Sequence, residues 1–178
     1  NNPKSKIPLC LITVTCNTSG GQPVSMKNIR EVSELCRRYG IPVFFDAARF
    51  AENAYFIRTR EKEYAGHEIR DIVKEMFSCV DGATMSSKKD ALVNIGGFLA
   101  CRDERLFEKI SMYCILYEGY LTYGGLAGRD LAAIAQGLKE GCEFDYLESR
   151  IRQVEYLAKL LRDYGVPFQE PPGGHAVF

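Results

Sequence analysis

Hydrophobic residues along the chain fall into short apolar runs that alternate with stretches of helical spacing. The run PLCLITVTC at residues 8–16 is rich in β-branched residues and has the length of a strand. Further strands are predicted at 41–45, 80–85 and 97–101. Because strands that are apolar throughout are typical of sheets covered on both faces, we expect a mostly parallel sheet.

The stretches between these strands show the spacing of amphipathic helices. Ser25 stands at the N-cap position of the first helix, and Gly40 is placed to end it. A final strand is expected after a turn at 171–174. The other predicted helices cover 52–63, 68–77, 104–117 and 128–164, the last with a break near 141–145. Strands that alternate with helices predict an α/β fold.

The two ends of the chain bear on its completeness. The chain starts at Asn1 without an initiator Met, and no signal peptide follows. It stops at Phe178, directly after a segment that has the character of a strand opening. Because a strand needs partners, we expect the chain to be an internal piece of a longer protein.

Composition narrows the classes of function. The 178 residues contain 23 Lys and Arg and 23 Asp and Glu, so the formal net charge is zero. A grip on nucleic acid through phosphate neutralisation needs a basic surplus, which this chain lacks. No apolar run approaches the roughly 20 residues that span a bilayer. We therefore expect neither nucleic acid nor membrane as a partner.

The chain has seven cysteines and no C-x-x-C pair. The absence of that pair removes the signature of zinc ribbons and thioredoxin-like redox sites. Most of the cysteines lie among apolar neighbours, where Cys packs as a small hydrophobic residue. Free thiols in this number are typical of a reducing compartment, so we expect the cytoplasm.

Polar side chains follow three of the predicted strands. Asn17 follows the first, Asp46 with nearby Arg49 follows the second, and the segment 86–89 (SSKK) follows the third. Ligands of open α/β sheets bind outside the carboxyl ends of the strands. If the three strands are parallel neighbours, these side chains converge on one edge of the sheet.

Each of these candidates also has a structural interpretation. Asp46 could instead cap the helix that follows, and its spacing to Arg49 also fits a surface ion pair. Lys88 and Lys89 could be a solvated pair, which is the commoner fate of adjacent lysines. If one of them enters the site, the two cations lower each other's pKa and make a neutral amine more accessible.

Five segments together resemble the β-eliminating lyases, the pyridoxal-phosphate (PLP) family of tryptophanase and tyrosine phenol-lyase. They run in family order across nearly the whole chain. The segments are NTSGGQPVS (17–25), FDAARFAENAYFI (45–57), TMSSKKDALVNIGGFLA (84–100), TYGGLAGRD (122–130) and GGHAVF (173–178). The resemblance implies a three-layer αβα sandwich with a mostly parallel sheet, the incomplete large domain of fold-type-I PLP enzymes.

The resemblance also implies roles for the converging residues. Lys89 corresponds to the lysine that holds PLP, and Lys88 to its neighbour that tunes the site. Asp46 corresponds to the partner of the pyridinium nitrogen, whose charged form a carboxylate stabilises. Arg49 and Asn17 would address the 3′-oxygen side of the ring.

Further roles are implied outside this group. Ser86 would contact a phosphate oxygen, Tyr123 lies in a loop near the cofactor, and Asn94 matches a position linked to a monovalent cation, usually potassium. The predicted domains are 1–145, the central part of the PLP-binding domain, and 146–178, a linking helix with the start of a small domain. The family usually forms homo-oligomers, dimers of dimers.

The implied reaction is β-elimination of an aromatic L-amino acid. Asn17–Gly20 and Ala48–Asn53 favour tryptophanase, which converts L-tryptophan to indole, pyruvate and ammonia, whereas Tyr117–Gly119 favours tyrosine phenol-lyase. Other PLP chemistry, such as β-elimination from cysteine, and a non-catalytic assembly domain are further alternatives. Ser87 and Tyr120–Leu121 depart from the family pattern, which leaves the shape of the pocket open.

Parts of the family's site are expected outside this sequence. The main phosphate-binding loop and a tyrosine acid/base precede Asn1 in the family, and the arginine that binds the substrate carboxylate follows Phe178. We therefore expect the 178-residue chain alone to bind PLP poorly and to show no turnover.

Overall fold

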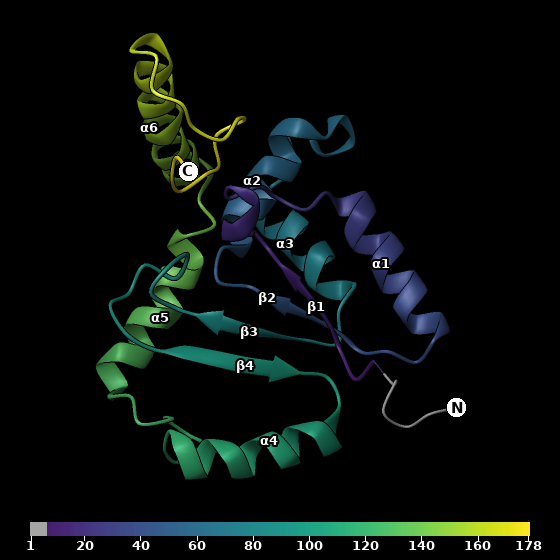
Figure 1. The fold of residues 1–178 in the computed structure, drawn as a ribbon. Helices are drawn as coiled ribbons and strands as arrows, with labels where there is room; N and C mark the ends of the chain where they lie inside the picture. Colours follow the sequence, from purple (N-terminus) through teal and green to yellow (C-terminus); the bar gives the residue numbers. More distant parts are fainter. Residues whose placement is uncertain (1–6) are drawn as a thin grey trace.

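The strands form one four-stranded sheet in the order β1-β2-β3-β4 (Figure 1). The computed structural model describes residues 7–178, so the first six residues of the predicted domain 1–145 lie outside it. Strands β1, β2 and β3 are parallel, and β4 runs antiparallel to β3. The strands are β1 (Cys10–Thr13), β2 (Val43–Asp46), β3 (Gly82–Ser86) and β4 (Gly97–Cys101). The predicted mostly parallel sheet is confirmed.

The predicted helices are present, with boundaries shifted by a few residues. Ser25 is the N-cap of the first, because its Oγ accepts a hydrogen bond from Asn28 N at 3.1 Å. The break expected near 141–145 is confirmed, since one helix ends at Glu140 and the next begins at Phe144. The helices are α1 (Met26–Arg38), α2 (Phe50–Arg60), α3 (Ile69–Ser78), α4 (Glu104–Tyr117), α5 (Gly128–Glu140) and α6 (Phe144–Asp163), with 3-10 turns η2 (Asn17–Ser19) and η3 (Lys62–Tyr64).

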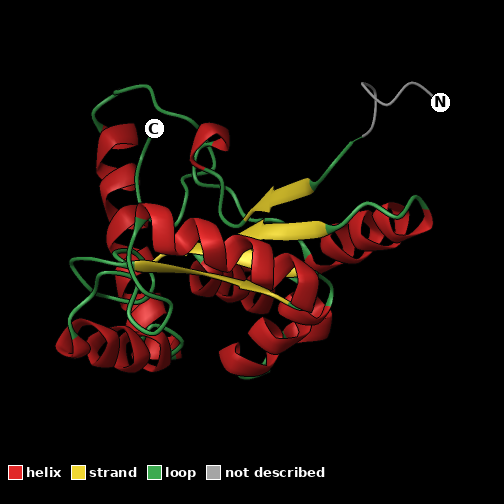
Figure 2. Cartoon of the chain, turned by 90° about the horizontal axis from the view of Figure 1, so that it is seen from below, coloured by secondary structure: helices red, strands yellow, loops and turns green. Residues whose placement is uncertain are grey.

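Helices flank the sheet along its length. Helices α1 and α3 lie near β1 and β2, whereas α4 runs beside β4 at the opposite edge (Figure 1). Seen from below, the strands lie side by side with helices around them (Figure 2). The predicted boundary between residues 145 and 146 falls in the first turn of α6, and this division into domains stays a prediction.

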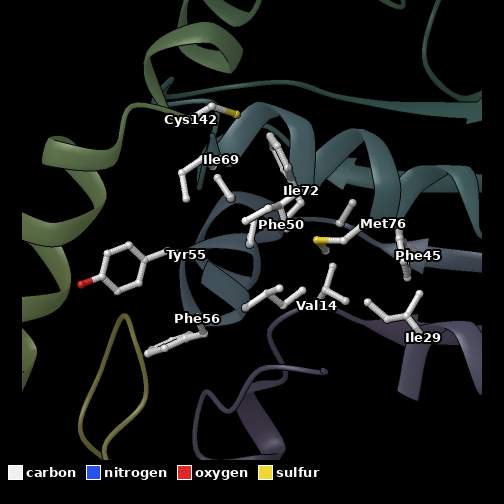
Figure 3. Close-up of a cluster of buried hydrophobic side chains, with 14 of the residues drawn as sticks. Val14, Ile29, Phe45, Phe50, Tyr55, Phe56, Ile69, Ile72, Met76 and Cys142 are labelled. Carbon is white, nitrogen blue, oxygen red and sulfur yellow. The ribbon is translucent and has the colours of Figure 1, made fainter. Parts of the chain in front are cut away.

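The hydrophobic core lies between the sheet and helices α1, α2 and α3 (Figure 3). Phe45, Ile29 and Met76 are completely buried there, and burial of each such side chain contributes about 1.5–3 kcal/mol. All eight residues of α2 from Phe50 to Ile57 are buried. The core therefore fixes the end of β2 and the start of α2, between which Asp46 and Arg49 lie.

Two expectations about the strands are wrong. The apolar residues of β2 and β3 are buried, whereas Leu11 on β1 is 53% exposed and Leu99 on β4 is 40% exposed. The reason is that β1 and β4 form the two edges of the sheet. Residues 175–178 form no strand, because they pair with no other strand in the described part of the chain. Phe178 O instead accepts a hydrogen bond from Gln169 N at 2.6 Å.

Two further properties bear on the expected environment. No helix within residues 7–178 is long and apolar enough to cross a membrane. All seven cysteines are free thiols in this structure, as the sequence predicts.

Candidate active site

The carboxyl ends of β1, β2 and β3 meet at one edge of the sheet. In the register of the strands, Thr13 pairs with Asp46, and Asp46 pairs with Thr84. Asn17 lies four residues beyond Thr13, and Ser86 ends β3. The predicted convergence of polar groups from the three strands is therefore confirmed.

Lys89 is held in the turn that follows β3. Its Nζ donates a hydrogen bond to Ser86 Oγ at 3.1 Å, and the side chain is half-buried. Burial lowers the pKa of Lys89 below its ordinary value, and the nearby charges of Arg49 and Lys88 lower it further, against the opposing charge of Asp46. A larger neutral fraction makes this amine a better nucleophile and base.

Lys88 points elsewhere. Its side chain is exposed, and no hydrogen bond or ion pair joins it to another residue of the described chain. Lys88 still contributes a charge near Lys89, which supports the prediction that the second lysine tunes the first. The adjacent lysines therefore have different environments, as expected for a pair with only one member in the site.

Asp46 does not cap the helix that follows. Among residues 7–178, its Oδ1 accepts a hydrogen bond from Ala48 N alone, at 3.4 Å, whereas the N-cap position of α2 is occupied by Arg49. Within residues 7–178, Asp46 forms no ion pair with Arg49 either. Both structural interpretations of Asp46 are thus wrong. Asp46 and Ser86 both line a hollow of about 900 Å³.

Arg49 and Asn17 lie together, as predicted. Arg49 Nη1 donates a hydrogen bond to Asn17 Oδ1 at 2.9 Å, although the two residues are 32 positions apart. The same oxygen lies 3.0 Å from Nε2 of His175, near the end of the chain. The guanidinium and the amide therefore form one polar group that can address an anionic ligand atom.

Three other residues that the sequence singled out form no hydrogen bond with Arg49 or Asn17 among the described residues. Asn94 is exposed, and no hydrogen bond joins its side chain to another described residue. Tyr123 is 47% exposed in the connection between α4 and α5. Ser87 is completely buried, and its Oγ has no hydrogen-bond partner among the described residues. The roles of Asn94 and Tyr123 stay predictions.

The sequence interpretation missed a buried ionic network behind the site. Glu52 is 0% exposed, and its Oε1 accepts hydrogen bonds from Thr15 Oγ1 at 2.7 Å and lies 2.8 Å from His175 Nδ1. Its Oε2 accepts a hydrogen bond from Arg150 Nη1 at 2.9 Å. One signal was present in the sequence, because Glu52 interrupts the apolar segment 50–57 and a buried charge requires a partner.

We expect Glu52→Gln to lower the free energy of unfolding by about 3 kcal/mol at pH 7, because it breaks a buried ion pair. Burial alone would raise the pKa of Glu52, but hydrogen bonds from His175 and Thr15 and the charge of Arg150 outweigh burial and lower it below the ordinary 4.5. The stabilisation is therefore complete above pH 4.5 and is lost as the pH falls through the folded-state pKa.

Urea unfolding of both proteins between pH 3 and pH 7 measures this effect. The difference in stability between the wild type and Glu52→Gln should shrink as the pH falls below 4.5. Glu31→Gln is the control, because Glu31 is 61% exposed and its change should stay within about 0.5 kcal/mol. A difference that does not vary with pH would contradict the role of the ionised carboxylate.

Comparison with known proteins identifies the family. The sequence model described as "Beta-eliminating lyase" matches residues 2–177. The chain belongs to the beta-eliminating lyase family. This confirms the resemblance, and with it the assignment of the chain to a family of lyases.

Relatives in the beta-eliminating lyase family have more than one name. The chain is 62% identical to "Probable beta-eliminating lyase" of Trichomonas vaginalis, over 98% of this chain and 38% of that protein. It is 58% identical to tyrosine phenol-lyase of Clostridium tetani, over 96% of this chain and 37% of that protein. It is 55% identical to "Probable tryptophanase" of Aeropyrum pernix, over 97% of this chain and 37% of that protein. The chain thus spans less than two-fifths of the length of these relatives.

Solved structures support the α/β sandwich of this beta-eliminating lyase chain. One is described as an aromatic amino acid beta-eliminating lyase/threonine aldolase from Exiguobacterium sp. 255-15, with a TM-score of 0.63 and 19% identity over 90% of this chain and 41% of that one. Another is described as an L-allo-threonine aldolase from Listeria monocytogenes, with a TM-score of 0.65 and 17% identity over 91% of this chain and 40% of that one. At these identities the similarity concerns the fold alone.

Proposed function

We propose that the protein is a PLP-dependent lyase that eliminates the side chain of an aromatic L-amino acid, with L-tryptophan as the substrate and indole, pyruvate and ammonia as products. The observation that carries this proposal is the position of Lys89, held by Ser86 beside the charges of Asp46 and Arg49. An amine of lowered pKa, a free carboxylate and a guanidinium are the groups that PLP requires. The residues present therefore fit the cofactor.

PLP, when bound, supplies an electron sink that weakens the bonds at Cα of an amino acid. Lys89 would hold the cofactor through its amine and, once the substrate amine takes that place, accept the proton from Cα. Its lowered pKa supports both tasks, because the neutral amine is the reactive form. Lys88 would keep that pKa low through its charge.

The remaining residues would orient the cofactor. The carboxylate of Asp46 would hold a proton on the ring nitrogen, since a negative charge favours the protonated form. Arg49 and Asn17, which are hydrogen-bonded to each other, would bind the 3′-oxygen. Ser86 would donate its hydroxyl proton to a phosphate oxygen when Lys89 is engaged with the cofactor.

Two further assignments belong to this proposal. Asn94 would contribute to a site for a potassium ion, and Tyr123 would lie in a loop over the cofactor. We also propose a homo-oligomer, a dimer of dimers, in the cytoplasm. Stacked and exposed Tyr113 and Tyr117, at 63% and 73%, support a subunit contact on α4, and the free thiols support a reducing compartment.

L-Tyrosine is the second candidate substrate, because relatives of similar identity are named tyrosine phenol-lyase and tryptophanase. We would record the visible spectrum of the full-length protein with PLP and potassium, add L-tryptophan, L-tyrosine or S-methylcysteine, and measure indole, phenol and pyruvate. We expect a visible band of bound PLP and release of indole with pyruvate. Phenol instead of indole would establish the alternative substrate, pyruvate only from S-methylcysteine would indicate other PLP chemistry, and the absence of any PLP band would refute the proposal.

A further inference from the structure

Asp90 follows Lys89 directly and joins two segments of the site. The side chain is 3% exposed, and its Oδ2 accepts hydrogen bonds from Ala51 N at 2.8 Å and Glu52 N at 3.0 Å. These amides belong to the first turn of α2, where backbone N–H groups lack partners within the helix. Asp90 therefore caps α2 from a position 38 or more residues along the chain.

The backbone of Asp90 reinforces this connection. Its N–H donates a hydrogen bond to Ala48 O at 3.2 Å, so backbone and side chain together make three hydrogen bonds to the segment 48–52. That segment begins two residues after Asp46 and contains Arg49. The residue next to Lys89 is thus fastened to the segment that carries the other proposed cofactor contacts.

Helix α5 holds the same backbone from the other side. A Cβ atom at Gly137 would lie 1.7 Å from Ala91 O, and one at Gly141 would lie 2.0 Å from Asp90 O. Only glycine allows the helix to approach so closely. The backbone after Lys89 is therefore packed between α5 and the start of α2.

The second oxygen of Asp90 lies next to charged groups. Arg150 Nη2, from α6, lies 3.4 Å from Oδ1, and the same guanidinium binds Glu52. Burial raises the pKa of Asp90 to about 6, because the Arg150 charge and the two α2 amides only partly offset the loss of water. Arg150 therefore links the cap to α6 as well.

We propose that Asp90 is a positioning residue that fixes Lys89 relative to Asp46 and Arg49 by capping α2. This role rests on the proposed function, because Lys89 is the lysine that would hold PLP. Asp90 itself touches neither Lys89 Nζ nor the hollow lined by Asp46. It acts through the backbone that carries the lysine.

This role has a consequence for the Lys89 amine. The charge of Arg49 contributes to the lowered pKa of Lys89, and that contribution depends on the distance between the two side chains. Asp90→Ala removes the shared acceptor of the two α2 amides, so two of the three hydrogen bonds between residue 90 and the segment with Arg49 are lost. We expect the pKa of Lys89 to move back towards its ordinary value.

The test is competitive acetylation of lysines with acetic anhydride at several pH values, read by mass spectrometry in the full-length protein without PLP. The pH midpoint of Lys89 labelling reports its pKa, whereas the labelling rate also depends on accessibility. We expect the midpoint to rise in Asp90→Ala. We expect Asp90→Asn to keep the wild-type midpoint, because asparagine is as good an acceptor for helix N-terminal amides as aspartate.

Asp103 offers a matched control. It caps α4 by accepting a hydrogen bond from Leu106 N at 2.6 Å, at a distance from the site. Asp103→Ala removes a helix cap of the same kind and should leave the Lys89 midpoint unchanged. A midpoint in Asp90→Ala equal to that of the wild type would overturn the proposal. If Asp90→Ala does not fold, Asp90→Ser, whose side chain is too short to accept from both amides, gives the same comparison.

A second measurement separates this proposal from the proposed function. Titration of the proteins with PLP, followed by visible absorbance, should give roughly tenfold weaker binding in Asp90→Ala than in Asp103→Ala or the wild type, equivalent to about one hydrogen-bonded cap. If the wild type binds PLP and Asp90→Ala binds it equally well, the positioning role fails alone. If the wild type binds no PLP, the proposed function fails, and the labelling midpoints still decide the role of Asp90.

Discussion

Replacing Lys89 by alanine should abolish the visible band of bound PLP and lower kcat/KM for L-tryptophan by about 10³-fold or more, since both the attachment of the cofactor and a general base are lost. Lys89 is the amine whose position in the structure fits both tasks. It is held by Ser86 Oγ at 3.1 Å, and its pKa is lowered by burial and by neighbouring cations. Absorbance with PLP and release of indole measure the two losses.

Lys89→Arg tests whether a positive charge at this position is enough for PLP binding and activity. Arginine keeps the cation but stays protonated at all relevant pH values, so it cannot serve as a nucleophile or base. It should therefore be as inactive as Lys89→Ala. Lys74→Ala is the surface control, because Lys74 is 77% exposed and, in the described part of the chain, forms an ion pair with Asp71 on α3 alone. A Lys89→Ala protein that keeps the PLP band would exclude Lys89 as the attachment point.

Replacing Asp46 by asparagine should lower kcat by about 10²–10³-fold while the PLP band remains, because it removes a preorganised charge without changing the shape of the side chain. The asparagine can still accept the hydrogen bond from Ala48 N. The charge of Asp46 also opposes the lowering of the Lys89 pKa, so Asp46→Asn should lower that pKa further. Competitive acetylation of the protein without PLP measures this shift as a change in the pH midpoint of Lys89 labelling.

Asp81→Asn is the matched control for this substitution. The Asp81 carboxylate accepts a hydrogen bond from Val43 N at 2.8 Å, at the opposite end of the same strand β2. Asp81→Asn should leave kcat and the pH midpoint of Lys89 labelling unchanged. If Asp46→Asn and Asp81→Asn have the same kcat as the wild type, then Asp46 has no electrostatic role in the reaction.

Much of the fold and the rim of the site follow from local patterns. Apolar runs predict β1, β2, β3 and β4, and helical spacing predicts the helices between them, because both periods are set by the backbone. Parallel strands joined by helical crossovers bring their carboxyl ends to one edge, so Asn17, Asp46 and Ser86 had to converge once the strands were neighbours. The segment 86–89 was placed at this edge for the same reason, whereas the choice of Lys89 over Lys88 came from the family resemblance.

The partners of these residues were less accessible to sequence reasoning. Asp46 had two structural interpretations, and neither holds, since Asp90 supplies the cap of α2 instead. Glu52 stands out in an apolar segment, which signals that a partner exists but does not identify it. The partner His175 lies 123 positions away, and Arg150 lies 98 positions away.

The sequence by itself thus determined at which edge of the sheet the polar candidates lie and to which family the pattern belongs, and it predicted which of them carry the chemistry. The tertiary structure alone decided how those residues are held. Asp90 caps the first turn of α2, Arg150 lies between Glu52 and Asp90, and Gly137 of α5 and the C-cap residue Gly141 pack against the backbone after Lys89. The physical reason is that strand and helix patterns repeat within a few residues, whereas a buried charge is satisfied by whichever polar group the packing brings near.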